Sequence, residues 1–107
     1  MSSEDAILVL TTAGSRDEAA NIAASLVESR LAACVQIVSE IESVYRWEGR
    51  VARETEWLLL CKTTAGRFAD VEQTILGLHS YTTPEVVAVR IESGSGAYLD
   101  WLRQSVL

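Results

Sequence analysis

Apolar and polar positions alternate in blocks along this chain, and the blocks predict a regular order of strands and helices. Ala6–Leu10 is a short apolar run with β-branched residues, which is typical of a strand. Further on, apolar residues recur at the spacing of one helix face: Ala19, Ile22, Ala23, Leu26 and Val27. We therefore predict a helix from about Ser15 to Leu31. Its start carries a capping box, in which Ser15 and Glu18 each satisfy a free backbone N–H.

A second strand and a long β-hairpin are predicted next. Cys34–Val38 and Thr55–Thr63 are apolar runs of strand length. In the hairpin between them, Tyr45 and Trp47 fall on the same face, because side chains alternate along a strand. Residues 48–50, with a central glycine, supply the turn.

The remaining third of the chain predicts a helix, a strand and a final short helix. Thr64 is a candidate N-cap for the helix, whose apolar face carries Phe68, Val71, Ile75 and Leu78. Pro84 lies in the turn that follows, and Val86–Ile91 is the fourth strand. The last helix has an apolar face of Tyr98, Trp101, Leu102 and Val106.

An internal repeat indicates how these elements are combined. Residues 11–14, Thr-Thr-Ala-Gly, recur as residues 63–66, and each copy follows an apolar strand and precedes an amphipathic helix. Two βαβ halves of this kind predict an α+β, ferredoxin-like βαββαβ sandwich with an extended hairpin and a C-terminal helix. The outer strands of its antiparallel sheet would be the second and the fourth. The length of 107 residues leaves room for one domain, residues 1–107.

Two exposed apolar features predict an oligomer. The fourth strand carries no charge over Val86–Val89, and an open apolar sheet edge invites pairing with another chain. The aromatic hairpin is too long for so small a domain to cover. We therefore predict an oligomer held by strand pairing between subunits, with an interface that includes Tyr45, Trp47, Val86, Val87 and Val89.

Charge and composition narrow the range of partners. The chain carries 9 basic and 15 acidic residues, a net charge of −6, which argues against nucleic acid and against an anionic membrane surface. No apolar stretch approaches the ~20 residues that span a bilayer, and residues 1–5 do not have the pattern of a signal peptide. We expect a cytoplasmic protein in which Cys34 and Cys61 are buried, reduced thiols.

The sequence contains no convincing catalytic constellation. The one histidine, His79, has no serine partner in a nucleophile-elbow context, and the chain has no glycine-rich phosphate loop and no zinc-spaced cluster. We therefore predict a protein that is not an enzyme and that has no organic cofactor. A small hydrolase of the acylphosphatase kind is disfavoured because Asn21, the only asparagine, lies inside the first helix.

A few residues remain as candidate ligands. His79 and Glu85 could converge on a metal ion such as copper, although a histidine at a helix C-terminus also has a purely structural explanation in the helix dipole. Lys62, the only lysine, is either a solvated strand end or the cation of a ligand-binding cleft. Trp47 and Tyr81 would line such a cleft, although a tryptophan is more often a packing residue.

Five motifs, in this order along the chain, resemble the CutA family, the divalent-cation tolerance proteins. The motifs are Arg30–Val35, Tyr45–Gly49, Lys62–Thr64, His79-x-Tyr81-x-x-Pro84-Glu85 and Tyr98–Leu102. The resemblance covers about Ala6 to Val106. It implies a ferredoxin-like chain in a compact homotrimer, similar in architecture to the PII signalling proteins, and a link to copper and other divalent metals without enzymatic activity.

This chain departs from the family pattern at two places. Ser80 stands where the family commonly has proline, and Thr11–Ala13 stand where many members have a cysteine. Since thiolate is the ligand that copper(I) prefers, we expect only weak divalent copper binding, at His79 with help from Glu85. The alternative function is a PII-like signalling module that binds a small anionic ligand in an intersubunit cleft near Lys62.

Overall fold

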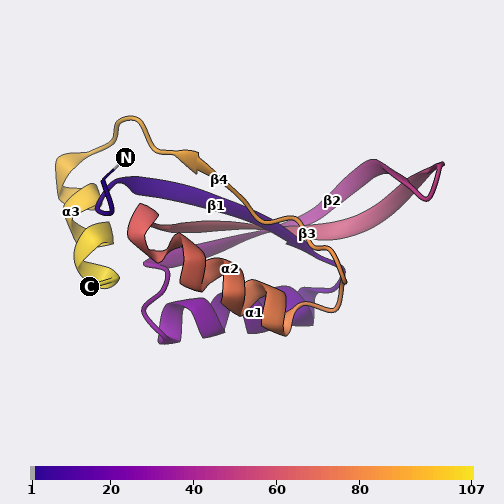
Figure 1. Ribbon diagram of the computed structural model, residues 1–107, viewed down its shortest axis with the longest axis horizontal. Coiled ribbons are helices and arrows are strands. Elements are labelled where there is room, and N and C mark those ends of the chain that lie inside the picture. The colour runs from indigo at the N-terminus through magenta and orange to yellow at the C-terminus, as the bar shows by residue number, and fades with distance from the viewer. Residues whose placement is uncertain (1) are drawn as a thin grey trace.

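The computed structural model describes residues 2–107 as one four-stranded antiparallel sheet with helices packed against it (Figure 1). The strands are β1 (Ala6–Ala13), β2 (Cys34–Trp47), β3 (Arg50–Thr64) and β4 (Val87–Arg90). The helices are α1 (Arg16–Glu28), the short 3-10 helix η1 (Ala65–Arg67), α2 (Phe68–Leu78) and α3 (Gly96–Ser105). The strand order β2-β3-β1-β4 places the second and fourth strands at the edges. The predicted ferredoxin-like architecture is confirmed.

The core lies between the sheet and the two central helices, which run along the same side of it in Figure 1. Alternate residues of the two inner strands point into this core, among them Val9 of β1 and Leu59 of β3. Ile22 of α1 and Ile75 of α2 meet them and are completely buried. This is the packing that the helical and strand periodicities predict, because each element turns its apolar face toward the same layer.

The first helix is shorter than predicted and only half of its capping box forms. The Ser15 hydroxyl accepts a hydrogen bond from the Glu18 N–H at 3.1 Å, as predicted. The Glu18 carboxylate instead accepts from the Ser80 N–H at 2.8 Å. The helix ends at Glu28 rather than near Leu31, because Arg30 takes a left-handed conformation with φ of 64° that cannot continue it.

The strands of the hairpin are longer than the sequence predicts. β2 and β3 stay paired up to the contact between Trp47 and Arg50, and their distal halves project beyond the two-layer body (Figure 1). We call residues 41–56 the arm. A β-bulge between Val38 and Ile41 marks the place where the arm begins. Tyr45 and Trp47 lie on the same face of the arm as Glu54 and Glu56, since directly opposed residues share a face.

The second half of the chain differs in detail from its prediction. Thr64 precedes η1 but makes no side-chain capping bond, so it is not the N-cap that we predicted for α2. On that helix, Val71 and Ile75 are fully buried, whereas Leu78 is 38% exposed. β4 forms only over Val87–Arg90, and these four residues are exposed at the sheet edge.

Candidate functional site

An open cleft of about 680 Å³ lies at the base of the arm. One wall comes from the arm and includes Tyr45, Trp47 and Glu56. The other wall is the loop that follows α2, with Tyr81 and Glu85. The floor includes Thr12, at the end of β1. Segments that are far apart in sequence therefore meet at this cleft.

A hydrogen bond joins the two walls of the cleft. The Tyr81 hydroxyl donates to a carboxylate oxygen of Glu56 at 2.9 Å, and Glu56 is only 6% exposed. Gly14 makes room for this phenol, because a Cβ at that position would lie 2.9 Å from the Tyr81 oxygen. Burial, together with the bond to Glu56, raises the pKa of Tyr81 well above the ordinary value for a phenol. Tyr81 therefore acts in the cleft as a neutral hydrogen-bond donor.

The charged residues that line the cleft are acidic. Glu56 and Glu85 both line it, and no basic side chain does so among residues 2–107. Desolvation and then the charges of Glu54 and Glu56 raise the pKa of Tyr45 on the same face of the arm. The negative charges of Glu56 and Glu85 attract cations and repel anions.

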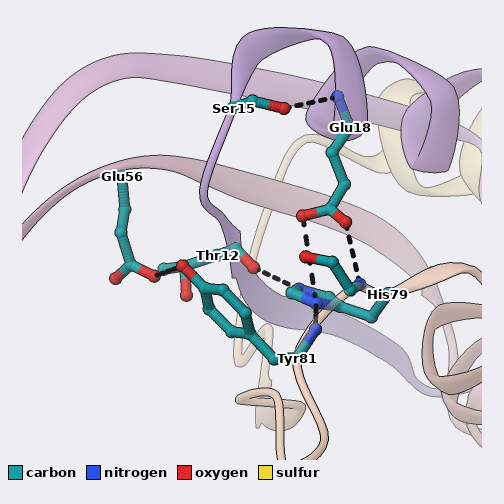
Figure 2. A network of polar contacts seen from close by, with 7 residues as sticks. Thr12, Ser15, Glu18, Glu56, His79 and Tyr81 are labelled. Carbon is teal, nitrogen blue, oxygen red and sulfur yellow. Dashed lines mark hydrogen bonds and ion pairs between the residues drawn. The ribbon is translucent and has the colours of Figure 1, made fainter.

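His79 connects the loop after α2 to the end of β1 (Figure 2). Its side chain is completely buried. Nε2 lies 2.6 Å from the Thr12 carbonyl oxygen, and Nδ1 accepts a hydrogen bond from the Tyr81 N–H at 3.1 Å. The imidazole and the Tyr81 ring are tilted against each other with centroids 4.7 Å apart. The histidine thus ties the loop to the end of β1.

Glu18 holds the same loop from the side of α1. Its carboxylate accepts from the Ser80 N–H and lies 4.0 Å from Nδ1 of His79. Desolvation acts to raise the pKa of Glu18, but the hydrogen bonds from Ser80 outweigh it, and the pKa lies below its ordinary value. Glu18 is therefore an ionised anchor at neutral pH.

The structure separates the two predicted metal ligands. Glu85 is exposed and lines the cleft, whereas both ring nitrogens of His79 already have protein partners beneath it. Residues 2–107 contain no group of three His, Cys, Asp or Glu side chains that could surround a metal ion. The geometry of one chain therefore does not fit a closed metal site, and it gives no support to the predicted copper binding at His79.

The predicted ligand-cleft residues are also separated. Trp47 and Tyr81 both line the cleft, but Lys62 lies elsewhere on the sheet, directly opposite Cys34. Its ammonium group donates to the Tyr98 hydroxyl at 3.4 Å and lies 5.4 Å from the centroid of that ring. Within one chain, Lys62 therefore belongs to a different environment from Trp47 and Tyr81.

The predicted interface residues are mostly accessible in the single chain. Tyr45, Trp47, Val87 and Val89 are exposed, by between 39% and 56% of their surface. Val86 is different, because it is partly buried and packs against the core.

The two cysteines differ in their surroundings. Both are free thiols. Cys61 is buried, which raises the pKa of its thiol to about 12, with a smaller contribution from Cys34. Cys34 is partly exposed and not buried as predicted, because it lies at the start of the edge strand β2.

Sequence reasoning missed several residues that build the cleft. In the sequence, Glu56 is a single carboxylate at the start of an apolar strand, and Glu18 reads only as a helix cap. Gly14 reads as part of a turn, although it also provides the space that Tyr81 occupies. A usable signal was the charged Glu56 directly before Trp57–Cys61, because a carboxylate next to a buried run needs a donor.

The family model of the CutA1 divalent ion tolerance protein matches residues 7–105 of the chain. This chain belongs to the CutA1 family. Among its curated relatives, the divalent-cation tolerance protein CutA of Thermus thermophilus is 49% identical over 98 residues, which cover 92% of this chain and 95% of that protein. The chloroplastic CutA protein of Arabidopsis thaliana is 42% identical over 99 residues, which cover 92% of this chain but 54% of that protein.

Solved CutA1 structures share the fold described above. The structure from Thermus thermophilus superposes with a TM-score of 0.92 at 48% identity and covers 94% of this chain and 97% of that one. The CutA structure from Archaeoglobus fulgidus, described as a periplasmic divalent cation tolerance protein, gives 0.93 at 40% identity, with 95% and 99% covered. The similarity therefore extends over nearly the whole chain.

The CutA1 relatives come from more than one compartment, since one is called chloroplastic and another periplasmic. In residues 2–107, none of the helices has the length and apolar character that a membrane span requires. The cytoplasmic location remains a prediction for this chain.

Proposed function

We propose that this CutA1-family chain is a homotrimeric, non-enzymatic protein of divalent-cation tolerance that binds divalent cations weakly in the cleft at the base of the arm. The observation that carries the proposal is the acidic lining of that cleft. Glu56 and Glu85 bring carboxylate oxygens to one open cavity that contains no basic side chain from residues 2–107. Carboxylate oxygens are ligands for hard and borderline divalent cations.

The trimer is proposed on the exposed apolar surface of the arm and of the β4 edge. Trp47 is 56% exposed, Val51 is 62% exposed, and Val87 and Val89 are about half exposed in the single chain. An exposed apolar arm and an unpaired sheet edge are surfaces that soluble proteins cover with another chain. Association would also bring residues of a neighbouring subunit to the mouth of the cleft, which Trp47 lines.

Weak rather than tight binding follows from the number of ligands. Two carboxylates from one chain leave a divalent ion largely hydrated, and the thiol that copper(I) prefers is missing near the end of β1, where Thr11–Ala13 stand. We expect a dissociation constant for divalent copper of about 1 μM or weaker, which corresponds to a binding free energy of roughly −8 kcal/mol or smaller in magnitude. A tighter site would require ligands from the neighbouring subunits.

The alternative of a small anionic ligand receives less support from this cleft. Its two carboxylates oppose an anion, and Lys62 lies apart from Trp47 and Tyr81. The cytoplasmic location is proposed on the free thiols of Cys34 and Cys61, which are typical of a reducing compartment.

Calorimetric titration with Cu²⁺ tests the proposed function. Glu85→Gln should weaken binding about tenfold or more, since one ligand charge is lost. Glu92→Gln removes the same charge from a residue outside the cleft and is the matched control. Light scattering on the same samples should report about three chain masses. Equal affinities for the wild type and both variants would contradict the cation site, and a stable single-chain mass would contradict the trimer.

A further inference from the structure

We propose that His79 is a positioning residue of the cleft and not a metal ligand: it holds Tyr81 so that the Tyr81 hydroxyl keeps the Glu56 carboxylate in place. The inference deepens the proposed function and rests on it, because it states which residues of the same cleft are left for a cation. It starts from the two hydrogen bonds of the imidazole (Figure 2).

The partners of the ring determine its tautomer. A carbonyl oxygen only accepts hydrogen bonds, so at 2.6 Å from the Thr12 oxygen the Nε2 atom of His79 must carry the hydrogen. The Tyr81 N–H only donates, so the Nδ1 atom must present its lone pair. Each nitrogen therefore has a matched partner in the neutral ring.

A metal ion would have to break one of these two bonds. At Nε2 the cation would replace the proton that binds the Thr12 carbonyl, and at Nδ1 it would displace the Tyr81 N–H. The side chain of His79 has no exposed surface, so a hydrated ion has no direct approach to either nitrogen. A buried N–H left without its partner costs free energy as well.

The same two bonds explain how the ring acts on the cleft. His79 connects the end of β1 to the backbone of Tyr81, and Glu18 holds the intervening residue through the Ser80 N–H at 2.8 Å. With its backbone fixed, Tyr81 places its hydroxyl 2.9 Å from Glu56 on the arm. The position of a cleft carboxylate thus depends on a histidine that does not itself line the cleft.

Nitrogen-15 NMR tests the first part directly, because His79 is the only histidine of the chain. We expect the spectrum of a neutral imidazole protonated at Nε2, with ring shifts that stay unchanged when diamagnetic Zn²⁺ is added. The carboxyl carbons of Glu56 and Glu85 should shift in the same titration. A metal-induced shift of either ring nitrogen would overturn the proposal. Unchanged carboxyl shifts would contradict the proposed function and leave the result for His79 intact.

Amide hydrogen exchange tests the positioning role. His79→Ala should increase the exchange of the Tyr81 N–H about tenfold, because its acceptor is lost, and His79→Asn should restore part of the protection by placing an amide oxygen near the position of Nδ1. The Ala33 N–H, bound to the Lys62 carbonyl at 2.8 Å, is the internal control and should not change. Equal Tyr81 exchange in the wild type and His79→Ala would overturn the proposal. If His79→Ala does not fold, Tyr81 N–H exchange is compared between His79→Asn and the wild type, and we expect faster exchange in His79→Asn because it restores only part of the protection.

Discussion

The two-layer body and the projecting arm of this molecule share strands β2 and β3 but differ in how their side chains are covered. In the body, β3 turns Leu59 and Cys61 into a core from which solvent is excluded. In the arm, the same strand carries Val51, which is 62% exposed, opposite a β2 segment with Trp47 at 56%. The difference shows that one continuous strand contributes to a buried core at one end and to an exposed apolar surface at the other.

The cleft lies where these two regions meet. Its lining combines Thr12 of the body with Trp47 of the arm, and the Tyr81–Glu56 hydrogen bond spans the boundary. A small shift of the arm would therefore change the distance between the carboxylates of the site. We therefore expect separate effects of mutations on unfolding, on subunit association and on the anchor of the cleft loop.

The largest effect is expected in the body. Leu59→Ala should lower the free energy of unfolding by about 2–5 kcal/mol, because it leaves a cavity in a fully buried site. Urea unfolding followed by circular dichroism measures this loss. Leu76→Ala makes the same chemical change on the outer side of α2, at 49% exposure, and should cost less than about 1 kcal/mol. Similar losses in both variants would contradict the assignment of the core.

A smaller effect of a different kind is expected in the arm. Trp47→Ala should weaken the association of subunits by about 1–3 kcal/mol, since large exposed aromatics act as interface anchors. Sedimentation equilibrium over a range of concentrations measures this change. The comparison variant is Trp57→Ala, in which a tryptophan packed against the core is lost and unfolding should be affected instead. An unchanged association constant for Trp47→Ala would show that this side chain does not anchor an interface.

The smallest effect concerns the anchor that joins α1 to the loop of the cleft. Glu18→Gln should reduce stability by about 1 kcal/mol at pH 7, because an ionised hydrogen-bond acceptor is lost. The folded-state pKa of Glu18 is lowered, so its contribution is complete above the unfolded value of 4.5 and is lost as the pH falls through the lower folded value.

The pH dependence of that variant provides its own test. Urea unfolding at pH 7 and below pH 4.5 should show a difference from the wild type that shrinks in acid. Glu28→Gln, at an exposed position on the same helix, should have no comparable effect. A difference that stays constant across this range would remove Glu18 as the ionised anchor of the loop.

The architecture was predictable because it depends on periodicity, which the sequence carries locally. The apolar spacing of Ile22 and Leu26 and the alternation along β1 both report burial on one face, and the structure places them there. The length of β2 was underestimated because polar residues such as Glu40 and Glu42 interrupt the apolar pattern. Backbone pairing with β3 nevertheless continues through that region beyond the bulge.

The cleft was predictable only in part. Trp47, Tyr81 and Glu85 were identified and do line it, whereas Glu56 was missed and Lys62 lies elsewhere. The sequence could not supply the missing information, because the site depends on the direction in which the arm leaves the body. His79 was predicted to be a metal ligand or a structural residue at a helix C-terminus, and its burial beneath the loop follows from tertiary packing and not from its neighbours in sequence.

The bulge between Val38 and Ile41 inserts one extra residue into β2 and shifts the alternation of its side chains by one position. Before it, even-numbered residues of β2 oppose even-numbered residues of β3; after it, odd-numbered residues such as Tyr45 take that place, so one extra residue has reset the alternation. A deletion of one residue here would remove the bulge and restore the regular alternation, and Ile41 and the later residues of β2 would keep their β3 partners and stay on the face of Glu56. This one residue therefore sets the local bend and twist of the arm and not the face that its side chains occupy.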